Sequence, residues 1–593
     1  MKRQLICSLA AACSMACLAG GEIEWWAVPA MSEYPCMPSE APREGEKGGT
    51  VRIRLARDEY EPGSFVVKAS ADLGKVQLEL GEFKQVKVKG EGEEKATGVV
   101  FPKDELDLKF VKVWYQNRNG WFSYFGDTGF KLIPELLVND EDLIRVDTAK
   151  EANYARLVGA DGKVTERWIN PPRQMNRRYY NHHRETYTFQ PMKADFRDAK
   201  TLQPVNLPKD GYRQFFLTVH AAKDASAGVY RGTIQLKNSS NSKTQTLGSI
   251  PVEIEVLPFE LPAPRSYLEP TKDFFVSSYN YLRIDHIMEE NGGDRGLAKR
   301  QLEAILRDQV KHGQNMHWGL GDNADFDTIF GAMKKAGMRT DVISAGGVAA
   351  RRLTPDELAA HAKRLRKFYD EKAPGAKVFL GFGDEPGQKW LMTSRPVFDA
   401  YRREGFSFVI AGTDNVFHKA GYIYDWLNSN TDPADGAKPA LWNTIGAAHV
   451  AWYSTMHVGP ENPAFNRRQN GMAAYLSNYS ALCNYAHHLG PYDDDSTTYK
   501  PMVFAYGVYD GVLDTLQWEG FREGIDDIRY ATLLVSLARA ARDSGDRDRD
   551  YAGRRALHFL GAFAKDHDDL DYCRAEMIRH IGILRGLLGK EAK

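Results

Sequence analysis

The hydrophobic periodicity of the chain changes after about residue 264, and this change constrains the fold more than any other feature. Before it, apolar and polar residues alternate, as at Val51, Ile53 and Leu55 and again over residues 215–219. A period of two is typical of antiparallel strands with one buried face. We therefore predict an all-β sandwich region over residues 22–264.

A stretch at about 111–205 interrupts this alternation. It is rich in aromatic and basic residues, including Trp114, Trp121 and the run from Arg177 to Arg184. We expect a long irregular insertion in the sandwich region. Two roles are open for it: its aromatic residues pack the insertion itself, or it reaches over the cleft of a neighbouring domain.

After the proline-punctuated segment Leu257–Pro264, helical patterns alternate with short apolar runs. One helix start is well marked, because Thr354, Pro355 and Glu357 form a capping box. Short apolar runs followed by helices recur up to residue 413, and further strand candidates lie at 440–443, 449–454 and 502–506. Repeated units of this kind predict an α/β domain, and their number favours a (β/α)8 TIM-like barrel over a doubly wound sheet. We place the barrel at residues 265–535 and C-terminal helices at 536–593.

Residues 1–19 have the composition of a secretory signal peptide. Lys2 and Arg3 precede an apolar run that ends in small residues and is too short to span a membrane. We therefore expect export, to the periplasm or outside the cell. Ser14–Cys17 also has the form of a poor lipoprotein signal, so a surface lipoprotein anchored at Cys17 is the alternative.

Charge and cysteine content narrow the range of partners. The net charge of -1 gives no electrostatic basis for binding nucleic acid. After the signal segment only Cys36, Cys483 and Cys573 remain, too few and too widely spaced for a disulfide framework or a zinc site. We expect a neutral partner and no metal or cofactor.

Two adjacent acids, Asp384 and Glu385, follow the run Val378–Phe382, which is apolar on both faces. Such a run is typical of a parallel strand covered by helices, and parallel α/β folds place their chemistry where those strands end. Because Pro386 disfavours a helical backbone at Glu385, we expect both acids on a turn. The alternative is an acidic helix start, with Glu385 as the N-cap and Pro386 at the first helical position.

Several motifs resemble, in order along the chain, those of glycoside hydrolase family 123. The N-terminal ones are similar to that family's sandwich region and the later ones to its barrel. They are Arg57–Pro62, Leu132–Leu137, Leu257–Pro262, Gly383–Pro386, Trp452-Tyr453, Pro460–Pro463 and Leu516–Tyr530. The resemblance covers most of the chain after the signal segment.

This resemblance implies an exo-acting, β-N-acetylgalactosaminidase-like enzyme with a glycan substrate and no cofactor. In that family the acetamido oxygen of the substrate attacks the anomeric carbon of the same sugar. By resemblance, Glu385 would be the acid/base residue and Asp384 would orient the acetamido group. Because the substrate supplies the nucleophile, no distant enzyme carboxylate is required. Crowding of the two acids should push their pKa values apart.

Aromatic residues near predicted strand ends are candidates for stacking on sugar rings, because a pyranose presents C–H groups to an aromatic face. They are Tyr453, Tyr506, Trp452, Tyr485, Trp318 and Trp442, with Tyr453 and Tyr506 preferred. Ordinary barrel packing is the other role open to each. Two segments depart from the family pattern and leave the identity of the sugar open, namely Cys483–His488 and Gly507–Gly511.

Two further functions are open. A glycosidase of another specificity would pair Glu385 with a second carboxylate about 5–9.5 Å away, and Asp341 and Asp322 are the candidates. A non-catalytic glycan-binding or scaffold protein would instead have Asp384 and Glu385 buried in packing, away from any cleft.

Overall fold

The computed structural model describes residues 23–89, 93–117, 124, 130–169, 195–240, 243–280, 282–289, 291–347, 353–412, 423–429, 449–453, 461–488, 503–509, 511–562 and 569–589. The chain divides into two compact units. The first comprises residues 1–30, 36–110 and 201–260, and the second comprises residues 31–35, 111–200 and 261–593. The expected insertion therefore groups mainly with the second unit.

The first unit contains two β-sheets. One has the order β2-β1-β4-β14 and then the start of β8, with bounds β1 (Ile23–Val28), β2 (Glu46–Lys47), β4 (Glu59–Ala69), β14 (Tyr212–Ala221) and β8 (Leu106–Asn117). The other has the order β13-β5-β15-β16-β3, with β6 and β7 beside it. Its bounds are β3 (Val51–Arg57), β5 (Lys75–Leu80), β6 (Lys84–Lys89), β7 (Glu93–Val100), β13 (Val205–Asn206), β15 (Gly228–Ser240) and β16 (Lys243–Glu260).

The predicted period of two decides which side chains enter the core of this unit. In β3, Val51, Ile53 and Leu55 are buried, whereas the intervening arginines are exposed. Val51 and Ile53 lie against Gly63 of β4, where an added Cβ would come within 2.8 Å of both side chains. The apolar faces of the two sheets therefore pack against each other.

Regular strands occupy part of the insertion that the sequence predicted to be irregular. They are β9 (Phe130–Val138), β10 (Ile144–Asp147), β11 (Ala152–Val158) and β12 (Val164–Ile169). The last three form an antiparallel sheet. In β11, Ala155 and Leu157 are buried and their neighbours less so, which is a period of two that a short strand displays only weakly. Residues 170–194, which include the basic run, lie outside the described part.

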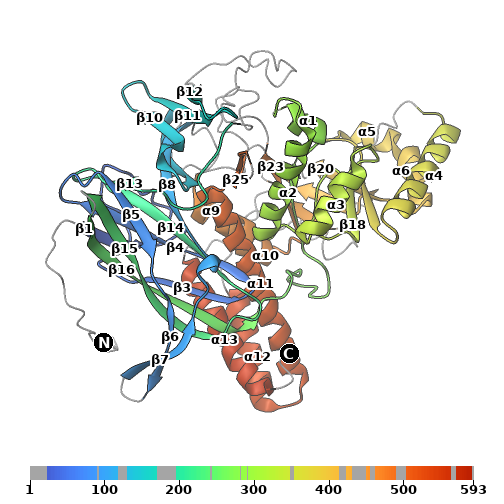
Figure 1. Ribbon diagram of the computed structural model, residues 1–593. Coiled ribbons are helices and arrows are strands. Elements are labelled where there is room, and N and C mark those ends of the chain that lie inside the picture. The colour runs from blue at the N-terminus through green and yellow to red at the C-terminus, as the bar shows by residue number, and fades with distance from the viewer. Residues whose placement is uncertain are drawn as a thin grey trace. The chain divides into compact units, whose positions relative to one another are not determined.

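In the second unit, parallel strands alternate with helices, which confirms the predicted α/β class (Figure 1). The strand order is β17-β23-β22-β21-β20-β19-β18. The strands are β17 (Phe275–Asn280), β18 (Val342–Gly347), β19 (Lys377–Gly381), β20 (Ser407–Gly412), β21 (Trp426–Ser429), β22 (His449–Trp452) and β23 (Ala481–His488). The helices among them are α1 (Ile284–Glu289), α2 (Arg295–Lys311), α3 (Phe326–Ala336), α4 (Pro355–Lys372), α5 (Gln388–Thr393), α6 (Arg395–Arg403), α9 (Pro463–Arg468) and α10 (Ala474–Leu476).

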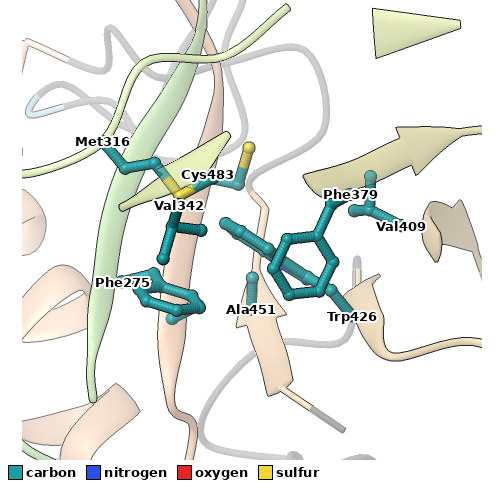
Figure 2. Packing of buried hydrophobic residues seen from close by; sticks show 9 residues of the cluster. Phe275, Met316, Val342, Phe379, Val409, Trp426, Ala451 and Cys483 are labelled. Carbon is teal, nitrogen blue, oxygen red and sulfur yellow. The ribbon is translucent and has the colours of Figure 1, made fainter. Parts of the chain in front are cut away.

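The parallel sheet curls around one apolar interior. Phe275 of β17 and Phe379 of β19 have ring centroids 6.4 Å apart. In a flat sheet the five strand spacings between β17 and β19 would separate them by roughly 24 Å. Figure 2 shows the shared cluster, to which every strand of this sheet contributes. Its members are Phe275, Met316, Val342, Phe379, Val409, Trp426, Ala451, Ala481 and Cys483.

The predicted closed eight-stranded barrel is not shown by the described residues. One of the short apolar runs expected to be a strand, at 315–318, is an irregular segment. The backbone of 315–320 nevertheless joins both sheet edges: Asn315 N donates to Val276 O (3.0 Å), and Leu320 N donates to Ser344 O (2.7 Å). The strand expected at 502–506 does not join the parallel sheet: of its described residues only Tyr506 is in a strand, β24 (Tyr506–Gly507), which pairs antiparallel with β25 (Val512–Leu513). Residues 440–443 lie outside the described part.

The C-terminal extension is helical, as predicted. It comprises α11 (Leu516–Asp543), α12 (Arg547–Ala562) and α13 (Leu570–Leu588). Because α11 runs without a break through residue 535, the parallel-sheet region and the extension share this helix. Across the described residues, we find no helix with the length and apolar character needed to span a membrane.

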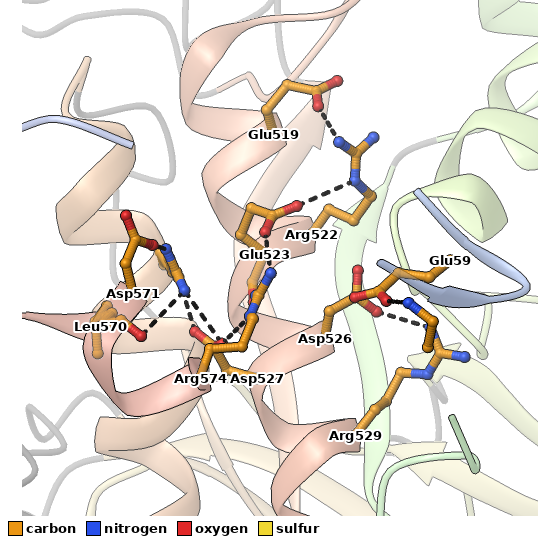
Figure 3. A network of polar contacts seen from close by, with 12 residues as sticks. Glu59, Glu519, Arg522, Glu523, Asp526, Asp527, Arg529, Leu570, Asp571 and Arg574 are labelled. Atoms are coloured by element: carbon orange, nitrogen blue, oxygen red, sulfur yellow. Dashed lines mark hydrogen bonds and ion pairs between the residues drawn. The ribbon is translucent and has the colours of Figure 1, made fainter. Parts of the chain in front are cut away.

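Buried ion pairs hold these helices together (Figure 3). Asp527 of α11 accepts from Arg467 of α9 at 2.8 Å and from Arg574 of α13 at 2.6 Å. Arg574 also pairs with Glu523 of α11 at 2.7 Å. All four side chains are buried, so each charge depends on its partners for the stabilisation that water would otherwise provide.

Candidate active site

A turn after β19 carries Asp384 and Glu385. Gly383 has a φ of 86°, and an added Cβ there would lie 2.5 Å from the ring of Trp390, so the turn requires glycine at this position. The backbone N–H of Glu385 donates to the carbonyl of Ala411 at 3.2 Å, which ties the turn to β20. Helix α5 starts only at Gln388, with Gly387 as its N-cap. The predicted turn is therefore confirmed, and the alternative with Glu385 as an N-cap is wrong.

Tyr453 connects this turn to the other side of the sheet interior. Its hydroxyl donates to Oε1 of Glu385 at 2.5 Å. The backbone N–H of Tyr453 donates to the carbonyl of Ser429 at 2.9 Å, so it directly follows β22 in register with β21. Because its ring is buried, this hydrogen bond holds the Glu385 carboxylate in a defined orientation.

Three of the predicted aromatic residues converge on Tyr279, at the end of β17, which was not among the predicted residues. The centroid of the Tyr279 ring lies 4.6 Å from that of Trp318, 5.5 Å from that of Tyr485 and 6.1 Å from that of Tyr453. Asn428 donates to the Tyr279 hydroxyl at 3.0 Å. The carboxyl ends of β17, β22 and β23, together with Trp318 of the segment 315–320, therefore supply an aromatic wall that includes the tyrosine bound to Glu385.

The electrostatics of the turn fit an acid pair. Asp384 and Glu385 are both exposed. Partial burial, and then the neighbouring charge of Glu385, raise the pKa of Asp384. Burial raises the pKa of Tyr453 as well, and the hydrogen bond to Glu385 raises it further. Tyr453 therefore stays protonated as a donor.

A solved structure resembles the chain along nearly all of its length. It is a family 123 glycoside hydrolase from Clostridium perfringens, described in connection with glycolipid glycan hydrolysis. The alignment covers 91% of this chain and 94% of that one, with a TM-score of 0.55 and 11% sequence identity. The chain has the fold of a family 123 glycoside hydrolase.

Other comparisons are weaker. A family 20 exo-β-N-acetylglucosaminidase from Vibrio harveyi, in complex with N-acetylglucosamine, aligns over 91% of this chain and 98% of its own at a TM-score of 0.21 and 8% identity, which is too distant to support an argument. No protein-family model and no curated protein matches the sequence.

Within this family 123 fold, three predicted sugar-stacking residues lie apart from the aromatic wall or outside the described residues. Because Ala451 and Tyr453 share the interior face of β22, Trp452 points to the opposite face. Tyr506 is buried, packs edge-on against Trp114 at 5.5 Å and accepts from Gln116, which favours the packing role. Trp442 lies outside the described residues.

The positions of the two alternative carboxylates differ. Asp341 precedes β18, its carbonyl accepts from the N–H of Lys377 at the amino end of β19, and its carboxylate pairs with Arg339 at 2.6 Å. Glu385 lies beyond the other end of β19, whose five residues alone span roughly 13 Å. Asp341 is therefore too far away to be the second carboxylate. Asp322 is exposed in the segment before α3 and stays open as a candidate.

Sequence reasoning missed Tyr279 and Asn428. Tyr279 lies on the interior face of β17, two residues after Ser277 and four after Phe275, so extending the apolar run at 274–276 by two strand periods would have found it. Asn428 lies on β21, a strand of four fully buried residues with no periodic signal. Its partner Tyr279 is 149 positions away in the chain, and only the fold brings them together.

One cluster of side chains has the composition of a metal site. Single ligand atoms of Asp308, His312 and Asp514 lie within 4.8 Å of one another, and all three residues are buried. Burial would lower the pKa of His312, but the charge of Asp308 and hydrogen bonds to Asp308 and Glu519 outweigh it and raise the pKa to about 9. His312 pairs with Asp308 at 3.2 Å and with Glu519 at 3.4 Å, so a metal ion at this cluster would have to displace the imidazole proton.

Proposed function

We propose that the protein is a glycoside hydrolase that removes terminal β-linked N-acetylhexosamine, of the N-acetylgalactosaminide type, from glycans by substrate-assisted catalysis. The observation that carries this proposal is the hydrogen bond from Tyr453 to Glu385. It fixes an exposed carboxylate beside a second acid, at the carboxyl end of a parallel sheet and next to an aromatic wall. Parallel-sheet enzymes of this architecture place their reacting groups at that end.

The chemistry divides between the two acids. Protonated Glu385 donates its proton to the glycosidic oxygen as the bond to the anomeric carbon breaks, while the acetamido oxygen of the same sugar bonds to that carbon. Carboxylate Asp384 accepts from the acetamido N–H and stabilises the positive charge of the cyclic intermediate. Water then attacks the anomeric carbon, Glu385 takes its proton, and the acetamido group re-forms. No second enzyme carboxylate is consumed or required.

The adjacency of the acids suits both steps. Burial first, and then the charge of Glu385, raises the pKa of Asp384, so the neighbouring carboxylates disfavour ionisation of both at once. Tyr453 keeps its own proton and orients the residue that transfers one.

We also propose that the curled sheet acts as a barrel of the (β/α)8 type. The segment 315–320 would take the place of the missing strand, since it bonds to Val276 on one side and Ser344 on the other. A barrel interior filled as in Figure 2 would leave the sugar only the end of the barrel, where Tyr279 and Trp318 pack against the cluster.

We propose export as the setting of this activity, on the basis of the signal segment, with Cys17 as a lipid attachment point in the alternative case. Fractionation of cells that carry the full chain tests this proposal. Recovery of the full-length chain from the cytoplasm would contradict export. If the wild-type chain is found with membranes and the Cys17→Ala chain is not, the result would support a lipid anchor at Cys17.

The test of the activity compares two aryl glycosides, one β-N-acetylgalactosaminide and one β-galactoside without the acetamido group. We expect cleavage of the first only, inhibition by a thiazoline analogue, and a loss of about 10²–10⁴-fold in Glu385→Gln, the range for a general acid/base. Asp384→Asn should lose activity on the same substrate. Equal cleavage of both glycosides, together with inactivity of Asp322→Asn, would favour the two-carboxylate alternative, and wild-type activity of Glu385→Gln would end the proposal.

A further inference from the structure

A groove lies between α12 and α13, in the C-terminal helices. Its volume is about 640 Å³, within the range that holds a small ligand. The α12 side chains recur at helical spacing, so they form one face of that helix. The lining residues are Tyr551, Arg554, Arg555, His558, Phe559 and Ala562 from α12, with Tyr572, Glu576, Arg579 and His580 from α13.

Aromatic rings stand open on both walls of the groove. Tyr551 is 63% exposed and Tyr572 is 53% exposed, and they come from different helices. Phe559 lies deeper and packs on His580 with centroids 5.4 Å apart. An exposed tyrosine offers a flat apolar face for the C–H groups of a ligand and a hydroxyl at its edge.

Positive charge faces the same space. Arg554 is paired with Asp550 and Arg579 with Glu576. Arg555 differs, since across the described residues it makes no ion pair and lies only over the ring of Tyr551, at 5.9 Å from the centroid. A guanidinium without a carboxylate partner is available to a ligand that brings its own anion.

The arginines of the two helices converge. Burial lowers the pKa of His580, and the charges of Arg579 and then Arg555 lower it further, against the opposing effect of Glu576. His580 therefore lies in the field of a cation from each wall. Because Arg554 is paired with Asp550 and Arg579 with Glu576, the charge of Arg555 remains in excess, and the field in the groove favours an anion.

We infer that the groove is a carbohydrate site that binds a pyranose carrying a sulfate or carboxylate group. The sugar ring stacks on Tyr551 or Tyr572, and its anionic group accepts from Arg555. A simple inorganic anion would use the arginines but leave the aromatic rings unused, whereas a neutral sugar would leave Arg555 without a partner. The inference rests on the groove alone and not on the proposed function of Asp384 and Glu385.

Calorimetric titration of the full chain with three probes tests the inference: N-acetylgalactosamine, its 6-sulfate and a glucuronic-acid disaccharide. We expect one or both anionic sugars to bind with a dissociation constant of about 0.1–1 mM, as for a small ligand on an open surface. The neutral sugar should bind the groove at least about tenfold more weakly. The two anionic probes distinguish sulfate from carboxylate recognition.

Variants locate the binding. Arg555→Ala and Tyr572→Ala should each weaken anionic sugar binding about tenfold or more, while Arg555→Lys should retain part of it. Arg547→Ala, an exposed residue of α12 that does not line the groove, is the matched control and should bind as wild type.

Three outcomes would overturn the inference: unchanged anionic sugar binding in Arg555→Ala, a loss in Arg555→Ala that is equal for neutral and anionic sugars, or complete competition by inorganic sulfate at matched concentration. Cleavage of the aryl glycoside should be the same in Arg555→Ala as in the wild type. A groove that does not bind anionic sugars would therefore not contradict the catalytic proposal, and an inactive enzyme would not contradict binding at the groove.

Discussion

The hydroxyl of Tyr453, beyond the end of β22, donates a hydrogen bond of 2.5 Å to Oε1 of Glu385, beyond the end of β19. In the sheet, β20 and β21 lie between those two strands. Three strand spacings in a flat sheet would place the two residues roughly 14 Å apart at the backbone. The contact therefore depends on the curl of the sheet, and it links the candidate acid to the aromatic wall.

We predict that Tyr453→Phe lowers kcat on the aryl N-acetylgalactosaminide about 10–100-fold, with a smaller change in KM. The substitution keeps the ring and removes one hydrogen bond to a charged group, worth about 1.5–3 kcal/mol. Steady-state kinetics give the measurement, and Tyr154→Phe on β11 is the control. A variant with wild-type kcat would show that Tyr453 does not position the acid.

Gly383→Ala tests the turn itself. A Cβ at this position would meet the ring of Trp390, and the φ of 86° is unfavourable for alanine, so the turn must shift. Since a displacement of about 1 Å can cost about 10²-fold, we expect a loss of kcat of about tenfold or more. Gly387→Ala is a matched control, because a Cβ there meets nothing within 4 Å and φ is -71°. Equal activities of the two variants would contradict the prediction.

Local sequence rules predicted some elements in full. Helix α4 starts at Pro355 behind the Thr354–Glu357 capping box, and Leu358, Ala362 and Leu365 are buried, as their spacing indicates. The strand ending before Asp384 is likewise found, because an apolar run and its flanking glycines are local properties. Capping boxes and apolar runs depend only on residues that are neighbours in the chain, so they can be recognised from the sequence alone.

The missed strands are those whose buried side chains are polar. β23 contains Asn484 and His487, which are buried, and a run with such residues has the composition of a loop. Asn484 satisfies its amide by donating to Asn470 at 2.6 Å. Packing of the whole domain brings Asn470 to this position, so no periodic pattern in the sequence predicts the pair. The Tyr279–Asn428 pair of the candidate site escaped for the same reason.

The pKa of His312 predicts a loss of stability in alkali. The folded protein holds this proton up to pH about 9, whereas the unfolded chain releases it near 6.5. The contribution of His312 to the free energy of unfolding should therefore be highest below pH 6.5. It should fall as pH rises from 6.5 to 9 and be constant above pH 9. The fall is up to about 3 kcal/mol.

Urea unfolding from pH 6 to 10 measures this fall. His312→Asn should be less stable at pH 6 and lose the slope, because Asp308 and Glu519 lose their cation at every pH. His558→Asn, at an exposed histidine, should keep the slope of the wild type. Parallel curves for His312→Asn and the wild type would show that another group sets the alkaline limit.

The close approach of α11 to the helical segment at 463–473 depends on Gly524. A Cβ at this position would lie 2.7 Å from the carbonyl oxygen of Arg467 and 3.0 Å from the backbone N of Gly471. Both atoms belong to backbone, so they cannot swing aside, and Gly524→Ala must push two buried elements apart. We expect a loss of about 1–3 kcal/mol in the free energy of unfolding.

Gly582→Ala on α13 is the matched control. An added Cβ there meets nothing within 4 Å, so the free energy of unfolding should instead rise by about 0.5–1 kcal/mol from helix propensity. Because both substitutions add one methyl group to a helical glycine, opposite shifts in the urea midpoint would isolate packing as the cause, and equal shifts would refute it.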